Sequence, residues 1–241
     1  MHLTTFSFQK KCVSLFAVVS LLSLIVFSQD SKAGGKASHS EEYPAINVEI
    51  ASYLSPLRDS SGVAKYRLAL CADVPNNKRP LQVAYHQESG HVFLVLQKIV
   101  PGTDTLHRVF GFYPRRGLPT LFFKTISSRI KDNSYREYDV EVSLDITAQH
   151  FDTIMAMAVD LAARKYHINK FNCYDYALRI FNAVAGDSTL PAVYVRFPFI
   201  FGRGGSPCSV YKDLTRLQSS VFWGSRIRFG VMRAPVSTHV R

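Results

Sequence analysis

HVFLVLQKIV, residues 91–100, is the most hydrophobic β-strand that the sequence predicts outside its first 28 residues. Apolar residues occupy both faces of this strand, which is typical of a central strand that is covered on both sides. Residues 101–104, PGTD, predict a turn, and residues 106–114, LHRVFGFYP, predict the next strand. The two strands together indicate a β-hairpin at the centre of the fold.

Further strands are predicted on both sides of this hairpin. They are residues 46–54 (INVEIASYL), 65–74 (KYRLALCADV), 81–87 (LQVAYHQ), 120–128 (TLFFKTISS) and 136–146 (REYDVEVSLDI). In the last of these, alternate residues from Tyr138 to Leu144 are apolar and those between them are polar. One face of that strand is therefore expected to contact solvent.

Two amphipathic helices follow the strands. The first is expected from Thr147, a suitable N-cap, to about Arg164, with its apolar residues on one face. The second is capped by Asn172 and ends near Gly186, a residue type that often follows a helix end. A third, short helix is predicted at residues 209–217. The expected fold class is α+β, with an antiparallel sheet and a packed helical pair.

Cys173 lies in the first turn of the second predicted helix. The positive end of the helix dipole stabilises a thiolate there, which makes the sulfur a better nucleophile. Such a nucleophile needs a base, usually a histidine within hydrogen-bonding distance. His91, directly after Gly90 at the start of the central strand, is the candidate base. The alternative for His91 is a half-exposed histidine at a strand end.

The first 28 residues predict a signal peptide. Lys10 and Lys11 precede an uncharged, mostly apolar run of 16 residues, 12–27, and the small-residue rule places cleavage after Ser28. An uncleaved N-terminal anchor is the alternative. Residues 29–44 are expected to be a flexible linker, residues 45–217 the folded domain and residues 218–241 a basic C-terminal tail. The protein is therefore expected to be exported.

The formal net charge of the 241-residue chain is +11, and cleavage would remove Lys10 and Lys11 and no acid, which leaves +9. This charge suits contact with an anionic envelope surface, although improved solubility is the simpler interpretation. The sequence has no alternation of basic and aromatic residues that would indicate a nucleic-acid partner. It has no CxxC or HExxH, so no metal and no other cofactor is expected.

Three cysteines remain after cleavage, and an odd number leaves at least one thiol unpaired. Either Cys71 pairs with Cys208 and Cys173 is free, or all three are single thiols. Because Cys71 falls within an alternating strand, we expect it to be structural rather than catalytic.

Three motifs occur in order along the chain: GHVFLVL at 90–96, FGFYP at 110–114 and NCYDYA at 172–177. Together they resemble the permuted papain-like cysteine hydrolases, the group that contains the NlpC/P60 and LRAT-like enzymes, and in particular an exported bacterial branch. The resemblance covers about residues 46–217. It implies a circularly permuted papain-like fold, with His91 on a strand and Cys173 at the start of a helix that packs against the sheet.

The resemblance implies that Cys173 is the nucleophile and His91 the base, with a third polar group that orients the histidine. His107 on the neighbouring strand is one candidate. In a simple hairpin, however, His91 pairs near Phe112 and His107 near Leu96, which places the two histidines on opposite faces. Asn172 is the other candidate, either as the helix cap or as an oxyanion donor. The backbone N–H of Cys173 is the more usual oxyanion donor.

The function expected from these features is an exported, monomeric cysteine hydrolase that cleaves an amide bond in a peptide or cell-envelope polymer, peptidoglycan among them. One alternative is an LRAT-like acyltransferase or thioesterase that acts on lipid, with Phe122, Phe123, Tyr194, Phe197 and Phe199 lining an acyl groove. The other alternative is a non-catalytic envelope-binding protein with the same fold.

Overall fold

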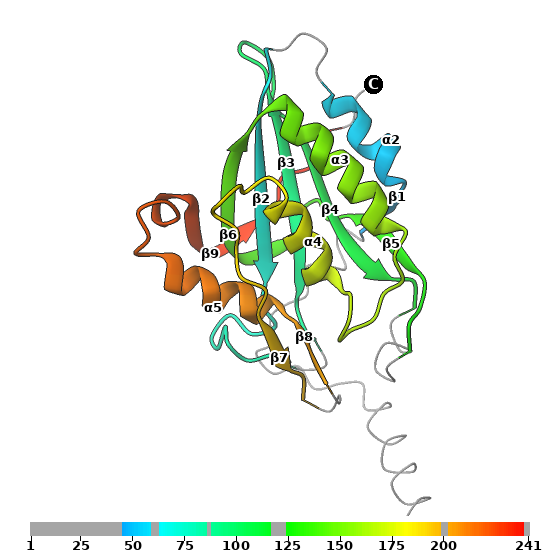
Figure 1. The fold of residues 1–241 in the computed structure, drawn as a ribbon, viewed down its shortest axis with the longest axis vertical. Coiled ribbons are helices and arrows are strands. Elements are labelled where there is room, and N and C mark those ends of the chain that lie inside the picture. The colour runs from blue at the N-terminus through cyan, green and yellow to red at the C-terminus, as the bar shows by residue number, and fades with distance from the viewer. Residues whose placement is uncertain (1–44, 59–62, 86–87, 117–123, 199–201, 239–241) are drawn as a thin grey trace, which may run out of the picture. The chain divides into compact units, whose positions relative to one another are not determined.

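The computed structural model describes residues 45–58, 63–85, 88–116, 124–198 and 202–238 (Figure 1). The predicted signal peptide and linker lie outside these residues. The described chain is α+β, and its main sheet has seven strands in the order β1-β5-β4-β3-β2-β6-β9. All the pairings recorded between these strands are antiparallel.

The strands of the main sheet are β1 (Asn47–Val48), β2 (Lys65–Asp73), β3 (His91–Ile99), β4 (Leu106–Pro114), β5 (Ser128–Asp132), β6 (Glu137–Ile146) and β9 (Ile227–Arg233). A separate hairpin consists of β7 (Tyr194–Arg196) and β8 (Arg203–Gly205). The helices are α2 (Ile50–Leu54), α3 (Ala148–Ala162), α4 (Cys173–Asn182) and α5 (Pro207–Leu217), with short 3₁₀ turns at Ser55–Leu57 and Gly224–Arg226. The predicted central hairpin is confirmed as β3 and β4, with β3 between β2 and β4.

Three predicted strands differ from the structure. Residues 46–54 form the short β1 and then α2, because the Glu49 carboxylate accepts hydrogen bonds from the N–H groups of Ala51 and Ser52 and caps a helix. The predicted strand at 120–128 is replaced by β5, which begins at Ser128; residues 120–123 lie outside the described residues. Over residues 81–85 a single bridge, between Tyr85 and Glu88, replaces the predicted strand.

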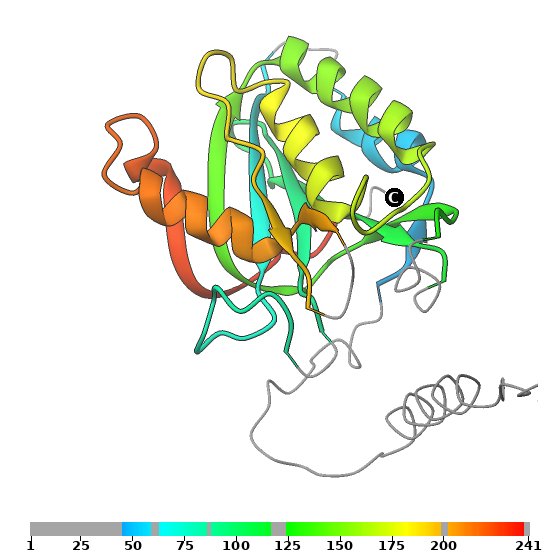
Figure 2. The same cartoon turned by 60° about the horizontal axis from the view of Figure 1, so that its bottom comes forward.

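Helices α3 and α4 lie across one face of the sheet, as Figures 1 and 2 show. We call this the helix face. Apolar side chains from β2, β3, β4 and β6 meet those of the helices there in one large core cluster. The residues on the helix face are those at alternate positions, such as Leu70 on β2, Leu94 on β3 and Phe112 on β4.

The opposite face carries a smaller apolar cluster that includes Cys71, Phe93 and Val95. Residues 234–238, which follow β9, cross this face and are here called the C-terminal strap. The Ala234 N–H donates to the Arg136 carbonyl over 2.8 Å, and the Thr238 N–H donates to the His107 carbonyl over 3.0 Å. We therefore call this side of the sheet the strap face.

The predicted tail at residues 218–241 is wrong for most of its described length. Strand β9 pairs with β6, so it completes the edge of the sheet. Trp223, Ala234 and Ser237 are at most 5% exposed. The segment has little periodicity because it packs through a 3₁₀ turn, an edge strand and a strap rather than through one regular element.

Strand β6 also departs from the expected solvent-facing pattern. A register shift between Tyr138 and Val140 breaks the alternation, and Tyr138 joins the cluster on the strap face. Asp139 and Glu141, expected to contact solvent, are buried. Asp139 accepts a hydrogen bond from the Val74 N–H over 2.8 Å, and Glu141 is held by Tyr138 and Arg228. These bonds compensate the carboxylates for lost hydration.

Candidate functional site

Helix α4 begins where the sequence predicted, with Asn172 as its N-cap. The Asn172 Oδ1 accepts a hydrogen bond from the Tyr174 N–H over 2.8 Å, and the Asp175 carboxylate accepts one from the Asn172 N–H over 3.0 Å. This reciprocal pair is a capping box, which fixes the first turn of the helix. Cys173 is thereby held at the first position of α4.

The Asn172 side chain has no amide proton left for a substrate. Its Nδ2 donates to the Ile168 carbonyl over 2.7 Å and to the Gly205 carbonyl over 3.0 Å. Asn172 is therefore a cap that ties α4 to β8, and its alternative role as an oxyanion donor does not fit these bonds. The Cys173 N–H lies in the first turn, where a helix supplies no acceptor of its own.

The Cys173 side chain is 8% exposed. Burial raises the pKa of its thiol to about 11, although hydrogen bonds from the Val92 and Tyr174 N–H groups and the charge of Arg136 act in the opposite direction. Desolvation penalises the thiolate by more than these groups stabilise it. The resting group is a neutral thiol, so the expectation that the helix dipole alone would favour a thiolate is corrected.

His91 opens β3, as predicted, but it is only 5% exposed rather than half-exposed. Burial lowers the pKa of its imidazole well below the usual value, and the positive charges of Arg136 and Lys131 lower it further. The ring stacks on Tyr113 with 4.2 Å between centroids. The resting imidazole is therefore neutral and able to accept a proton.

Cys173 and His91 both lie near the first residues of β3, but on opposite faces of the sheet. The His91 ring lies near that of Phe93 on the strap face, whereas α4 packs on the helix face. The recorded pairing of β3 with β4 starts at Leu94–Phe110, so Val92 precedes it. The Val92 N–H bonds the Cys173 thiol there. The thiol is thus bonded to the backbone of the residue after His91, and within the described residues no hydrogen bond joins the Cys173 and His91 side chains.

Asn133 is a neighbour of His91 that the sequence did not indicate. A Cβ on Gly111 would lie 2.4 Å from the His91 Nε2 and 2.5 Å from the Asn133 Oδ1, so the two atoms share the space above that glycine. Both are buried, and neither has a hydrogen-bond partner among the described residues. An Nε2–H that donates to Oδ1 would satisfy both atoms.

Asn133 is placed by the tight turn between β5 and β6. Its N–H donates to the Val109 carbonyl over 2.9 Å, and its Nδ2 donates to the Tyr113 hydroxyl. The turn contains Tyr135 with a φ of 65°. The run DNSYR in the sequence does indicate a turn, but it does not show which strand the turn folds over.

His107 is not the third member of the site. The hairpin pairs His107 with Gln97, one residue away from the expected register, so His107 does lie on the same face as His91. However, Gln97 is six residues along β3 from His91, a separation of about 20 Å. His107 instead meets the C-terminal strap through its backbone N–H and carbonyl.

Arg136 brings a positive charge to the site. Its Nη2 lies 2.8 Å from the Asp73 carboxylate, and its Nη1 lies 3.5 Å from the Tyr113 hydroxyl. Its charge acts on both Cys173 and His91, lowering the pKa of each. A fixed cation at this position stabilises negative charge that develops on the sulfur.

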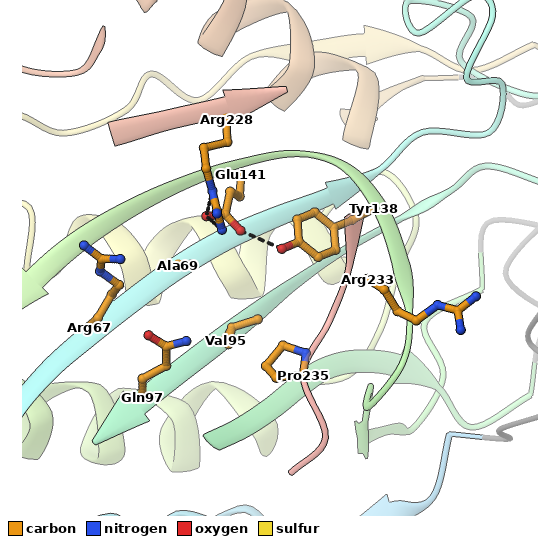
Figure 3. Close-up of a pocket in the computed structure, with 9 residues that line it drawn as sticks. All are labelled: Arg67, Ala69, Val95, Gln97, Tyr138, Glu141, Arg228, Arg233 and Pro235. Atoms are coloured by element: carbon orange, nitrogen blue, oxygen red, sulfur yellow. Dashed lines mark hydrogen bonds and ion pairs between the residues drawn. The ribbon is translucent and has the colours of Figure 1, made fainter. Parts of the chain in front are cut away.

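The two main cavities in the described chain differ in charge. One, of about 410 Å³, lies beside the start of α4 and is lined by Asn169, Lys170, Tyr194 and Arg203. The other, of about 210 Å³, lies on the strap face and is shown in Figure 3. Its Arg67 and Arg228 are ion-paired with Asp145 and Glu141.

Cys71, Cys173 and Cys208 are all free, so the open alternative of three single thiols holds and the Cys71–Cys208 pair does not form. Within the described ranges, no cluster of three His, Cys, Asp or Glu side chains could hold a metal ion. None of the helices in those ranges has both the length and the apolar character needed to cross a membrane.

No family model, curated protein or solved structure matches this chain.

Proposed function

We propose that the protein is an exported bacterial cysteine hydrolase with a circularly permuted papain-like fold. Cys173 is its nucleophile, His91 its base and Asn133 the group that orients the histidine. The observation that carries the proposal is the bond from the Val92 N–H to the Cys173 thiol, since Val92 directly follows His91 on β3. The motifs GHVFLVL, FGFYP and NCYDYA supply the resemblance that suggested the pair.

The reaction starts from two neutral groups. Nδ1 of His91 takes the proton from the Cys173 thiol as the sulfur attacks the carbonyl carbon, and the imidazolium then gives that proton to the leaving amine. Water hydrolyses the resulting thioester and regenerates the thiol. The Cys173 N–H, at the positive end of α4, is placed to stabilise the oxyanion. Arg136 stabilises the thiolate while it exists.

The substrate class in this proposal is a peptide amide, with peptidoglycan as one source. Lipid is less favoured by the described aromatic residues. Phe197, expected in an acyl groove, is 5% exposed and belongs to the core, and Tyr194 lines a cavity that also contains two cationic side chains. Phe122, Phe123 and Phe199 lie outside the described residues.

A non-catalytic envelope-binding protein is the second candidate. The observation that favours it is the burial of both groups, which leaves the thiol and the imidazole neutral. A site that had lost its activity would look the same in this respect. The two candidates differ in whether His91 changes the reactivity of Cys173.

The test measures alkylation of Cys173 by iodoacetamide from pH 6 to pH 11, in a background of Cys71→Ser and Cys208→Ser. If His91 acts as a base, labelling at pH 7 falls by about tenfold or more in His91→Ala, as loss of general-base assistance predicts. His107→Ala, on the same sheet face but on β4 opposite Gln97, is the matched control and keeps the rate. Equal labelling in wild type and His91→Ala would overturn the catalytic proposal and leave the binding protein.

A further inference from the structure

We propose that the cavity beside the start of α4 binds a carboxylate of the substrate, so that the enzyme acts on anionic peptides in preference to neutral ones. This inference rests on the proposed function, because it assigns the substrate class of that same site. It starts from the position of the cavity, its charge and the way its walls are held.

The cavity lies close to the nucleophile. Lys170, in its wall, precedes Cys173 by three residues, so their Cα atoms lie within about 11 Å of each other. Tyr194, in the opposite wall, donates its hydroxyl proton to the Asp175 Oδ1 over 3.1 Å, and Asp175 is in the first turn of α4. Figures 1 and 2 show the β7–β8 hairpin beside that end of the helix.

The charge of the wall is positive. Lys170 and Arg203 are both exposed, and no carboxylate occurs among the described residues that line the cavity. The nearby Asp175 is 3% exposed, and its oxygens accept hydrogen bonds from Asn172 and Tyr194. The two cations are therefore available to a bound anion, and an Arg–carboxylate contact is among the stronger hydrogen-bonded pairs.

The cationic wall is also fixed in place. The Arg203 Nη2 donates to the Tyr194 carbonyl over 3.0 Å, which holds the guanidinium across the β7–β8 hairpin and leaves its other N–H groups for a ligand. Asn172 ties the base of the hairpin to α4 through the Gly205 carbonyl. Since α4 and the hairpin are joined at two points, Arg203 keeps its position relative to Cys173.

The second cavity shows that arginines in a wall are not enough. In Figure 3, Arg228 contacts Glu141, and Tyr138 donates to the same carboxylate. Arg67 of that cavity is paired with Asp145. Two of the three arginines in that wall are thus paired with carboxylates, whereas neither cation of the cavity beside α4 is in an ion pair among the described residues. Because of this difference, we assign the anion to the cavity beside α4.

The experiment uses two reagents that differ by one charge: the racemic N-chloroacetyl derivatives of glutamic acid α-amide and of glutamine amide. In each, the Cys173 sulfur displaces chloride to form a thioether, and His91 takes the thiol proton. The measured quantity is the ratio of their labelling rates at Cys173, in full-length protein that carries Cys71→Ser and Cys208→Ser. We expect wild type to prefer the glutamic acid reagent by about five- to tenfold at low salt.

Lys170→Met should reduce this ratio by about threefold, Arg203→Gln should also reduce it, and Lys170→Glu should bring it to one or below. Lys165→Met, an exposed lysine outside the cavity wall, is the matched control and should leave the ratio unchanged. Equal rates for the two reagents in wild type, or a preference that survives Lys170→Glu, would overturn the anion site alone. Labelling that does not depend on His91 would instead overturn the proposed function.

Discussion

The helix face and the strap face of the sheet are covered by different kinds of side chain. On the helix face, Phe112 packs against the rings of Tyr166, Phe171 and Tyr176, with centroids 5.1–5.6 Å apart. On the strap face, its neighbour Gly111 supports the polar pair His91 and Asn133. Adjacent residues of β4 thus have opposite surroundings, and the comparison teaches that one face is packed by apolar rings whereas the other also buries polar side chains.

The largest expected effect is on the helix face. Phe112→Ala removes a fully buried ring from the aromatic cluster and should lower the free energy of unfolding by about 3–5 kcal/mol. Denaturant unfolding measures this loss. His91-dependent labelling of Cys173 should persist in the folded fraction at low temperature. Val231→Ala on β9, at a side chain that is 62% exposed, is the control and should change stability by less than about 0.5 kcal/mol.

Gly111→Ala should have the reverse effect, because it should change the labelling of Cys173 rather than mainly the free energy of unfolding. The added methyl would lie 2.4 Å from the His91 Nε2 and 2.5 Å from the Asn133 Oδ1, so both side chains must shift from their present positions. Misplacement of a catalytic group by about 1 Å costs about a hundredfold in rate, so the His91-dependent labelling should be lost. Gly102→Ala is the control: it strains a turn with a φ of 79° but meets no atom within 4 Å, and should affect stability alone.

A smaller effect is expected from the strap. The Ser237 Oγ donates to the Asp132 carboxylate over 2.9 Å and lies 2.5 Å from the Tyr53 hydroxyl, and its N–H donates to the Ser134 Oγ over 2.8 Å. Ser237→Ala should cost about 1–3 kcal/mol, because it leaves buried polar groups without a partner. Because the strap is bound to the turn that carries Asn133, labelling should also slow.

Val236→Ala, at an exposed strap residue, is the control for Ser237→Ala. It shortens a side chain of the same segment and leaves the Ser237 bonds intact. If Ser237→Ala and Val236→Ala had the same stability and the same labelling rate as wild type, the strap would be a passive cover. The strap contacts would then give no support to the proposed difference between the two faces.

The smallest expected effect is a pH dependence of stability. The folded pKa of His91 is below that of the unfolded chain, so the unfolded state binds a proton first as the pH falls. The stability due to a neutral His91 is present above about pH 6.5 and is lost below it, by up to about 1.4 kcal/mol per pH unit. His91→Gln should flatten this slope in urea unfolding curves, and His150→Gln, at a partly exposed position on α3, should keep it.

The charges of the groups around His91 support a lowered pKa and therefore the direction of this pH dependence. Lys131 and Arg136 both oppose a positive charge on the imidazole, and Tyr113 and Asn133 are uncharged at these pH values. Asp73, which lies opposite His91 in the pairing of β2 with β3, is bound to Arg136. Parallel slopes in wild type and His91→Gln would show that the pKa of the imidazole is not lowered by folding.

The helix face could be predicted from the sequence because its signals are periodic. Alternation in residues 65–74, the apolar run at 91–100 and the helical spacing after Thr147 and Asn172 gave β2, β3, α3 and the start of α4 to within two residues, whereas α4 ends at Asn182 rather than near Gly186. The two groups of the proposed dyad could be found for the same reason, since each stands at the start of such an element. The register of β3 and β4 was missed by one residue, because a hairpin loop of several residues does not fix it.

The strap face could not be predicted, because its contacts join segments with no local pattern. Asn133 and Arg136 come from a short turn, and Ser237 comes from an irregular segment near the end of the chain. The buried Asp139 and Glu141 look like solvent-facing residues of an amphipathic strand until their partners, Val74 and Arg228, are known. The pKa of Cys173 depends in the same way on tertiary burial, which opposes the local helix effect.

The C-terminal strap also determines when the chain can fold. Its residues bond to Tyr53, His107 and Arg136, and β9 pairs with β6, so these contacts close loops of about 90 to 180 residues. Contacts this distant in sequence form late, since loop closure must precede them. The turn that lies over His91 is therefore expected to be held in place late in folding, with the pairing of β9 and β6.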